Sequence, residues 1–401
     1  MVLLMPNKIN HLHIKNFRSL ADIHITPDSL NILFGPNGAG KSTFLDTIWF
    51  IRDCAIRGVD SAASFRDHGI GILWDGANTT DNILISIEDE STKYEVLFGL
   101  SAGRIEPFVG EKLVKKINNE LLIDRTIGSD KAIFYHLGMG QDKTTITLRE
   151  PEKLALTSYV AFGTSDIAAL ELDKLLRAAR SYHLRGASLF NLRRSGSESE
   201  AGDRLQDRCE NLWSVLRNLH DRRVIDERYD TIINFMKESF PSFDGLYFEQ
   251  TGRNAVYANF LDRKRRKPIQ ASGVSDGHIQ MLINLAALFS EKPNGYSLIL
   301  LDEPDISLHP WALAVLAKAV KLATEKWNKQ VFISTHSPVL ISQFAPENIW
   351  AMELDENGQS MMKRVSEIEE IQDLLEDYAT GSLYMAEAIA PQSKAFTEEL
   401  K

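Results

Sequence analysis

Cysteine is nearly missing from this chain: its 401 residues include only two, Cys54 and Cys209. They lie too far apart for the spacing of a metal site, and so little cysteine suits a reducing compartment. The sequence also lacks an apolar run of the roughly 18 residues that a membrane helix needs. Pro6 interrupts the short apolar stretch at the start, which leaves no room for a signal peptide. We therefore expect a cytoplasmic protein with no membrane partner.

An excess of basic residues is missing as well. The chain has 45 lysines and arginines against 55 aspartates and glutamates, a formal net charge of −10, so its surface as a whole should not bind nucleic acid. Two local basic segments remain, RKRRK at 263–267 and the arginines between 177 and 194. The simpler interpretation makes the first a solvated hairpin tip and the second a solvated helix face. The alternative is a contact with double-stranded DNA.

The hydrophobic pattern changes along the chain and predicts a mixed α/β fold. It indicates short strands in residues 8–34, a helix from about Lys41 to Ala55, and an antiparallel meander from about 70 to 150. Residues 165–240 are mostly helical, and two strands (245–251 and 255–262) then lead back to the core. Residues 273–355 alternate helices with buried strands, as in a parallel sheet with crossover helices. We expect an N-terminal lobe (1–160), a helical arm (161–270) and a C-terminal lobe (271–401).

The most informative motif is GPNGAGKS at residues 35–42, which fits GxxxxGK[ST] between a predicted strand and a predicted helix. Its glycines allow backbone N–H groups to surround phosphates at a helix N-terminus. Lys41 is expected to reach the β- and γ-phosphates of ATP, and Ser42 to offer its hydroxyl to Mg²⁺. The nucleotide-binding residues predicted here are Asn37, Gly38, Ala39, Gly40, Lys41, Ser42 and Thr43.

Two apolar strands further along end in polar residues: LILLDEP at 298–304 and QVFISTHSP at 330–338. Ligands of open α/β sheets bind at the carboxyl ends of the strands. Asp302 is placed to hold Mg²⁺, and Glu303 to orient or deprotonate an attacking water. His336 ends the neighbouring strand, where it senses the γ-phosphate or, like many solitary histidines, is structural.

A further motif, SGVSDGH at 272–278, opens a predicted helix. Ser275 suits an N-cap, which needs no ligand. A serine hydroxyl and free N–H groups at a helix start also bind phosphate, so the same residues allow a functional interpretation.

Segments spread over nearly the whole chain resemble the ABC-type ATPases of the RecF/SMC group, and in particular the ATPase half of OLD-family proteins. They are IKNFRS (14–19), GPNGAGKST (35–43), Tyr182-His183, Asn211-Leu212, SDG (275–277), LLDEPDISLHP (300–310) and STHSPVL (334–340). The resemblance implies a homodimer in which Ser275 and Gly277 of one subunit cap the γ-phosphate bound by the other. It also implies that the loop from Ser307 to His309 crosses the dimer interface, and that Arg18 approaches the nucleotide.

The chain departs from the family pattern in two places. A glutamine that contacts Mg²⁺ and water is not found, because Gln141 falls in a predicted hairpin turn and residues 156–166 contain none. The residues after about 355 carry no DxD signature of the Toprim nuclease that follows the ATPase in OLD proteins, so we expect no nuclease here.

Two functions remain open. One is a Mg²⁺-ATP-hydrolysing dimer that serves DNA maintenance or anti-phage defence. The other is a slow or non-hydrolysing sensor that controls a separate effector, such as a nuclease encoded nearby.

Overall fold

A computed structural model gives the fold of residues 8–66, 70–78, 80–101, 103–137, 143–163, 166–182, 186–251, 254–293 and 296–391. At its centre is a six-stranded sheet, parallel except for its last strand. In spatial order the strands are β12 (Ala179–Tyr182), β17 (Ser297–Asp302), β18 (Lys329–Thr335), β3 (Leu30–Phe34), β19 (Ile349–Leu354) and β20 (Ser360–Arg364). Both faces of this sheet are covered, and accordingly every residue of β3 and β18 and all but the last residue of β17 are buried. The predicted α/β core is therefore confirmed.

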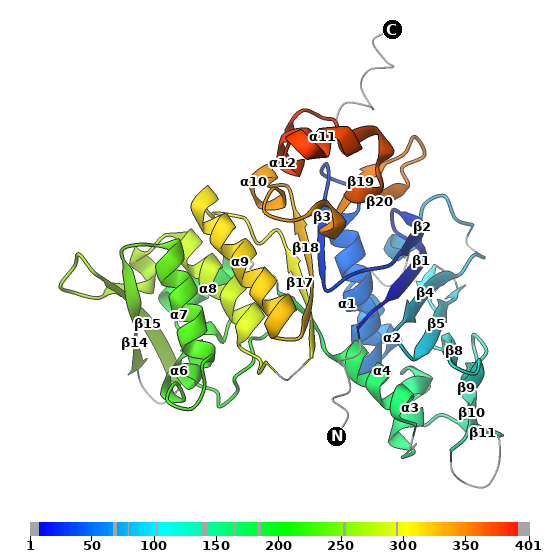
Figure 1. Cartoon of the computed structure of the whole chain (residues 1–401). Coiled ribbons are helices and arrows are strands. Elements are labelled where there is room, and N and C mark those ends of the chain that lie inside the picture. The colour runs from blue at the N-terminus through cyan, green and yellow to red at the C-terminus, as the bar shows by residue number, and fades with distance from the viewer. Residues whose placement is uncertain are drawn as a thin grey trace.

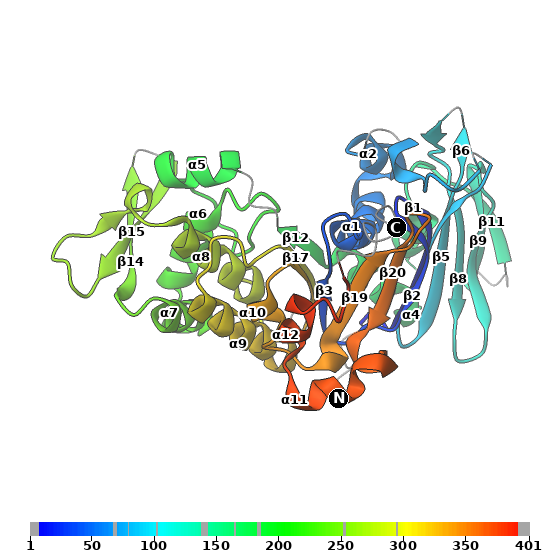
Figure 2. The same cartoon turned by 90° about the horizontal axis from the view of Figure 1, so that it is seen from above.

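Helix α1 (Lys41–Arg57) lies between this sheet and a second, antiparallel sheet of eight strands (Figures 1 and 2). Phe44 of α1 contacts Phe332 of the parallel sheet, whereas Phe50 contacts Phe17 and Phe98 of the antiparallel one. The predicted meander is confirmed, and the first two strands of the chain complete its edge. The strand order is β11 (Lys143–Thr147), β10 (Lys131–Tyr135), β9 (Glu120–Arg125), β8 (Gly110–Lys115), β5 (Thr92–Phe98), β4 (Ile83–Glu88), β1 (His11–Phe17) and β2 (Leu20–Ile25).

The opposite face of the parallel sheet is covered by α8 (Asp276–Phe289) and α9 (Pro310–Lys326), with α7 (Arg228–Ser239) packed on both. Helix α8 is apolar nearly all round its axis because it is buried among these neighbours. The remaining helices are α2 (Val59–Ser64), α3 (Ala155–Ala161), α4 (Ile167–Arg177), α5 (Gly186–Arg194), α6 (Leu212–Asp221), α10 (Pro338–Ile341), α11 (Gln372–Asp377) and α12 (Thr380–Met385). Among the described helices none is both long and apolar enough to cross a membrane.

The two strands expected to lead back to the core form a sheet of their own instead. β14 (Phe243–Thr251) pairs with β15 (Ala255–Asp262), whose other edge pairs with the short strands β13 (Ser197–Glu198) and β16 (Ile269–Gln270). The basic segment 263–267 follows β15 as an exposed turn, so the prediction of a solvated turn is confirmed.

The expectation that the arginines between 177 and 194 share a solvated helix face is wrong for Arg180. This residue lies in β12, a strand of the core sheet, and its side chain is buried. Its guanidinium pairs with Glu291 at 2.9 Å. A buried cation needs such a partner, because leaving it alone in the protein interior is costly.

Candidate functional site

The phosphate-binding motif forms the connection between β3 and α1. Gly35 and Gly40 have φ angles of +151° and +96°, which side chains rarely tolerate. A Cβ on Gly35 would lie 1.9 Å from the carbonyl oxygen of Met352 on β19. These glycines therefore let the loop turn tightly at the start of the helix. The loop and the first turn of α1 contain all of the nucleotide-binding residues predicted from the motif, Asn37 to Thr43.

The ammonium group of Lys41 folds back over this loop. Its Nζ donates to the carbonyl oxygens of Gly35 and Pro36, at 2.9 Å each. Burial lowers the pKa of Lys41 to about 8, although the carboxylates of Glu303 and Asp302 act in the opposite direction. The ammonium group of Lys41 therefore loses its proton more readily than that of a free lysine.

Ser42, in the first turn of α1, forms a hydrogen bond with Asp302 at the end of β17. Its Oγ donates to the Asp302 carboxylate at 2.9 Å, and Ser334 Oγ, from the end of β18, donates to the same Oδ1. Hydroxyl and carboxylate oxygens are the ligands that Mg²⁺ prefers. The donor set therefore fits the predicted cation, with Ser42 and Asp302 as the residues that would hold it.

Glu303 and His336 lie beside this pair. The Glu303 backbone has a φ of +50°, uncommon for a residue other than glycine, and its N–H donates to the carbonyl oxygen of Ser334 at 3.0 Å. Its carboxylate is 3.5 Å from Nε2 of His336. Burial, with a smaller contribution from Lys41, lowers the pKa of His336, which favours the neutral imidazole at neutral pH.

The SDG motif begins α8, as predicted. Ser275 occupies the N-cap position, but its side chain makes no capping bond; its Oγ lies 2.8 Å from Nδ1 of His278 instead. Arg193 contacts the same loop, because it donates to the Val274 carbonyl oxygen and pairs with Asp276 at 2.7 Å. The serine therefore fills the place of a helix cap while its hydroxyl is used elsewhere.

The start of α8 also packs against the turn that follows Glu303. A Cβ on Gly277 would lie 2.5 Å from the carbonyl oxygen of Ser307, whose own φ is +65°. About two helical turns further along, the amide of Asn284 donates to the Pro304 carbonyl oxygen at 2.8 Å. Helix α8 and the turn after Glu303 are thus in contact at two points of one chain. His309 follows as the N-cap of α9, where its side chain accepts a bond from Trp311 N–H.

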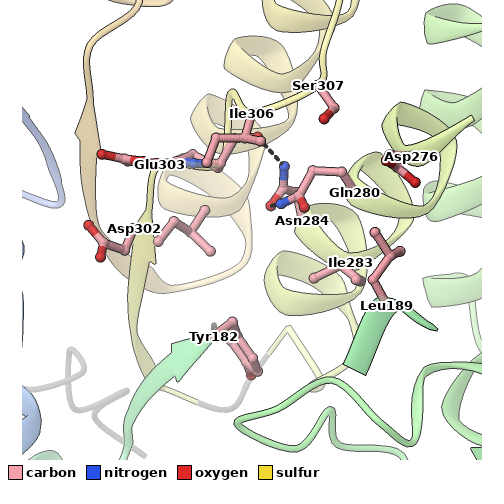
Figure 3. A pocket seen from close by; sticks show the side chains of 12 residues that line it. Tyr182, Leu189, Asp276, Gln280, Ile283, Asn284, Asp302, Glu303, Ile306 and Ser307 are labelled. Carbon is pink, nitrogen blue, oxygen red and sulfur yellow. Dashed lines mark hydrogen bonds between the residues drawn. The ribbon is translucent and has the colours of Figure 1, made fainter. Parts of the chain in front are cut away.

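A cavity of about 230 Å³ separates the end of the β12 strand from α8 (Figure 3). It is lined by Asp302 and Glu303 on one side and by Gln280 and Asn284 of α8 on the other. Tyr182, the last residue of β12, also lines it, and the buried hydroxyl of this residue has no hydrogen-bond partner among the described residues.

The sheet order thus puts the end of β12, rather than residues 156–166, next to the Asp-Glu strand. Helix α3, which contains most of residues 156–166, packs on β9 of the antiparallel sheet instead. Gln141 and His183 lie outside the described residues. Sequence reasoning missed the positions of Tyr182, Ser334 and Asn284 in this site. The strand ARSY of β12 is too short for its alternation to be noticed, although the Tyr182-His183 pair matched the family pattern.

Arg18 lies in the turn between β1 and β2, close to the phosphate loop. Its Nη1 pairs with Asp46 of α1 at 3.0 Å, and Arg66 binds the same carboxylate. The neighbouring Ser19 hydroxyl is 2.8 Å from that of Ser360. Both hydroxyls pack against Gly40 of the phosphate loop, since a Cβ on this glycine would meet both of them. The expected approach of Arg18 to a nucleotide stays a prediction.

Two protein families match overlapping parts of the chain. Residues 11–195 match the family described as "AAA domain", and residues 143–342 match "AAA domain, putative AbiEii toxin, Type IV TA system". The solved structure of an Smc head bound to the C-winged helix domain of ScpA is similar in fold. It has a TM-score of 0.50 at 13% identity and covers 91% of this chain and 99% of its own.

Curated relatives include nucleases and DNA repair proteins. The Old nuclease of Escherichia phage P2 is 22% identical over 385 residues, which cover 92% of this chain and 63% of the nuclease. Endonuclease GajA of Bacillus cereus is 24% identical over 83% of this chain and 56% of its own length. The DNA replication and repair protein RecF of Shewanella piezotolerans is 29% identical over 114 residues. The chain thus spans roughly three fifths of the two nucleases that it matches over most of its length.

Proposed function

The chain belongs to the AAA/ABC-type ATPases related to RecF, to SMC heads and to the ATPase part of OLD proteins, and we propose that it hydrolyses Mg²⁺-ATP between two copies of itself. The observation that carries this proposal is the contact of Ser42 with Asp302, 260 residues apart in sequence. It brings the phosphate loop and the Asp-Glu strand to one sheet edge, with Glu303 and His336 beside them.

Each side chain then has a role that its position allows. Lys41 binds the β- and γ-phosphates, and Ser42 and Asp302 hold Mg²⁺, which neutralises phosphate charge when bound. Glu303 accepts a proton from the water whose oxygen forms the new bond to the γ-phosphorus, while the bond from that phosphorus to the bridging oxygen breaks and ADP leaves. Neutral His336 donates a hydrogen bond to the γ-phosphate.

The second half of each site comes from the other subunit in this proposal. Ser275 and the first N–H groups of α8 in the partner copy cap the γ-phosphate, because a helix N-terminus favours an anion. Gly277 has no side chain, which allows the close approach of the Ser307 carbonyl to that helix start. Closing of the dimer therefore depends on ATP, and hydrolysis opens it.

Replacing Glu303 by Gln tests the dimer, because it removes the base and leaves the binding residues in place. We expect light scattering to show a doubling of the mass of Glu303→Gln protein on addition of Mg²⁺-ATP. The matched control is the Lys41→Ala/Glu303→Gln double variant, which should stay monomeric. A Glu303→Gln protein that binds ATP but keeps its monomer mass would contradict the in-trans site.

A second candidate function is a nucleotide-gated switch that controls a nuclease acting as a separate effector. It is favoured by the matches to two nucleases, of which this chain spans 63% and 56%. The switch would be supported by a protein that binds ATP but turns it over less than about once per hour, since typical enzymes turn over orders of magnitude faster.

Double-stranded DNA is the partner that the RecF match and the exposed basic turn 263–267 suggest. A short duplex added to the light-scattering experiment tests it. Co-migration with the ATP-bound dimer that weakens steeply with salt would support DNA binding, and no co-migration in either nucleotide state would count against it.

A further inference from the structure

The hairpin of β1 and β2 carries a group of metal-ligating side chains on its exposed face, away from the nucleotide site. The strands read HLH at 11–13 and DIH at 22–24, and side chains two residues apart point to the same face of a strand. The antiparallel register puts His13 directly opposite His24. Asp22 is two residues before His24, so two imidazoles and a carboxylate share one small patch.

The ligand atoms of His13, Asp22 and His24 already converge. Nε2 of His13 is 2.8 Å from Oδ1 of Asp22, and Nε2 of His24 is 3.2 Å from the same oxygen. All three ligand atoms lie within 4.8 Å of one another. A tetrahedral Zn²⁺ with bonds of about 2.0–2.1 Å separates its ligands by about 3.4 Å. The 3.2 Å separation is close to this value, whereas the 2.8 Å separation is about 0.6 Å shorter, so the His13 imidazole and the Asp22 carboxylate would move apart by about that much to bind the ion.

A third imidazole adjoins the group. The ring of His11 is centred 5.9 Å from that of His24, and its buried Nδ1 has no hydrogen-bond partner among the described residues. His11 is two residues before His13 and so lies on the same face of β1. Its Nδ1 is 3.9 Å from a carboxylate oxygen of Glu88 on β4, and its position beside His24 makes it the candidate for a fourth ligand.

We propose that His13, Asp22 and His24, with His11 or a water molecule as fourth ligand, form a site for a transition-metal ion of the Zn²⁺ class. Imidazole nitrogens with one carboxylate favour Zn²⁺ and its neighbours over Mg²⁺, which prefers oxygen alone. The site is therefore chemically distinct from the cation site at Ser42 and Asp302.

Such an ion would join β1 to β2 just before and after the turn that carries Arg18. The same turn supports the phosphate loop through Ser19. Zn²⁺ would therefore stabilise the hairpin from which Arg18 projects, without taking part in ATP chemistry.

The test uses the whole chain, purified without a polyhistidine tag and stripped of metal, in excess Mg²⁺ so that the nucleotide site does not compete. Zn²⁺ is titrated against a chromogenic chelator, and Co²⁺ is added separately because its visible spectrum reports tetrahedral ligation. We expect one ion per chain, and an affinity at least about 100-fold lower in His13→Asn/His24→Asn protein, since both imidazoles are direct ligands. Asp22→Asn should weaken binding by about tenfold.

His136→Asn is the matched control, because His136 is also paired with a carboxylate, Glu120 at 2.8 Å, but is outside this group. Its φ of +56° suits asparagine. This variant should bind Zn²⁺ like the wild type. Equal Zn²⁺ affinity in the wild type and the His13→Asn/His24→Asn protein, each shown to be folded by circular dichroism, would overturn the proposal. So would a Co²⁺ spectrum without tetrahedral bands.

Discussion

Lys41 lies in a local environment that differs strongly from that of a free side chain. Its ammonium group is buried against two carbonyl oxygens and has a pKa of about 8, well below the usual 10.5, because burial disfavours the charge. In the nucleotide-free protein the cation is thus present below about pH 8 and lost above it. Phosphates favour the cation, so binding at higher pH must take up a proton.

The affinity for ATP should consequently fall as the pH rises through 8, approaching about tenfold per pH unit. Equilibrium titration with a fluorescent ATP analogue, between about pH 7 and pH 9.5, measures this dependence of the affinity on pH. Lys41→Arg is the control, since its side chain stays charged throughout, and whatever affinity it retains should not vary with pH. A constant affinity of the wild type over this range would contradict the role given to Lys41.

At the scale of elements, the contact between α8 and the turn 303–308 is the feature most open to test. The helix start and the turn touch where Gly277 faces the Ser307 carbonyl, and Asn284 bonds the Pro304 carbonyl further down. Two residues of the turn have a positive φ, Glu303 and Ser307. Glu303 directly precedes Pro304, which accepts the bond from Asn284, and Ser307 itself contacts Gly277. We therefore expect a shift of α8 to move the backbone that carries Glu303.

Gly277→Ala should disturb this contact, because the new Cβ would lie 2.5 Å from the Ser307 carbonyl oxygen. Overpacking of this kind costs about 1–3 kcal/mol, so we expect ATP turnover to fall at least about tenfold. Binding of ATP to the phosphate loop of the same chain should hardly change, since that loop belongs to another element. Steady-state hydrolysis and nucleotide titration separate the two.

Gly202→Ala offers a comparison, as nothing lies within 4 Å of the Cβ it would add. Its turnover should match that of the wild type. If Gly277→Ala also hydrolyses ATP at the wild-type rate, the close approach of α8 to the turn has no part in the reaction.

At the scale of the whole molecule, the proposal makes each site a product of two chains. Lys41→Ala disables the half-site of the phosphate loop, and Ser275→Arg disables the capping half-site. In a mixed dimer one site receives both defects and the other receives neither. Mixing the two inactive proteins should thus restore hydrolysis, to about a quarter of the wild-type rate per chain, since half of the dimers are mixed and each has one intact site.

Mixing Lys41→Ala with Glu303→Gln provides the control, because both changes affect the half-site that holds the phosphates and the water. No combination of those two chains creates an intact site, so no activity should return. Recovery in this control, or its absence in the first mixture, would show that Ser275 does not act on the nucleotide of the other chain.

The sequence by itself determined the parts of this protein whose chemistry is local. A strand, a glycine-rich turn and a helix are consecutive in residues 30–57, so the motif predicted the loop, Lys41 and Ser42. The apolar runs before Asp302 and His336 likewise predicted two buried strands ending at one edge, because parallel strands align their carboxyl ends. The antiparallel meander followed from alternation alone.

Only the tertiary structure decided which distant residues meet. Alternation does not encode the order of strands in a sheet, and that order is what brings Tyr182 beside the Asp-Glu strand. Ser334 bonds Asp302 because β17 and β18 pair in one register, and Asn284 reaches Pro304 because α8 packs on that turn. His13 faces His24 because β1 and β2 pair in a register that the tight turn between them and the burial of one face impose on the hairpin.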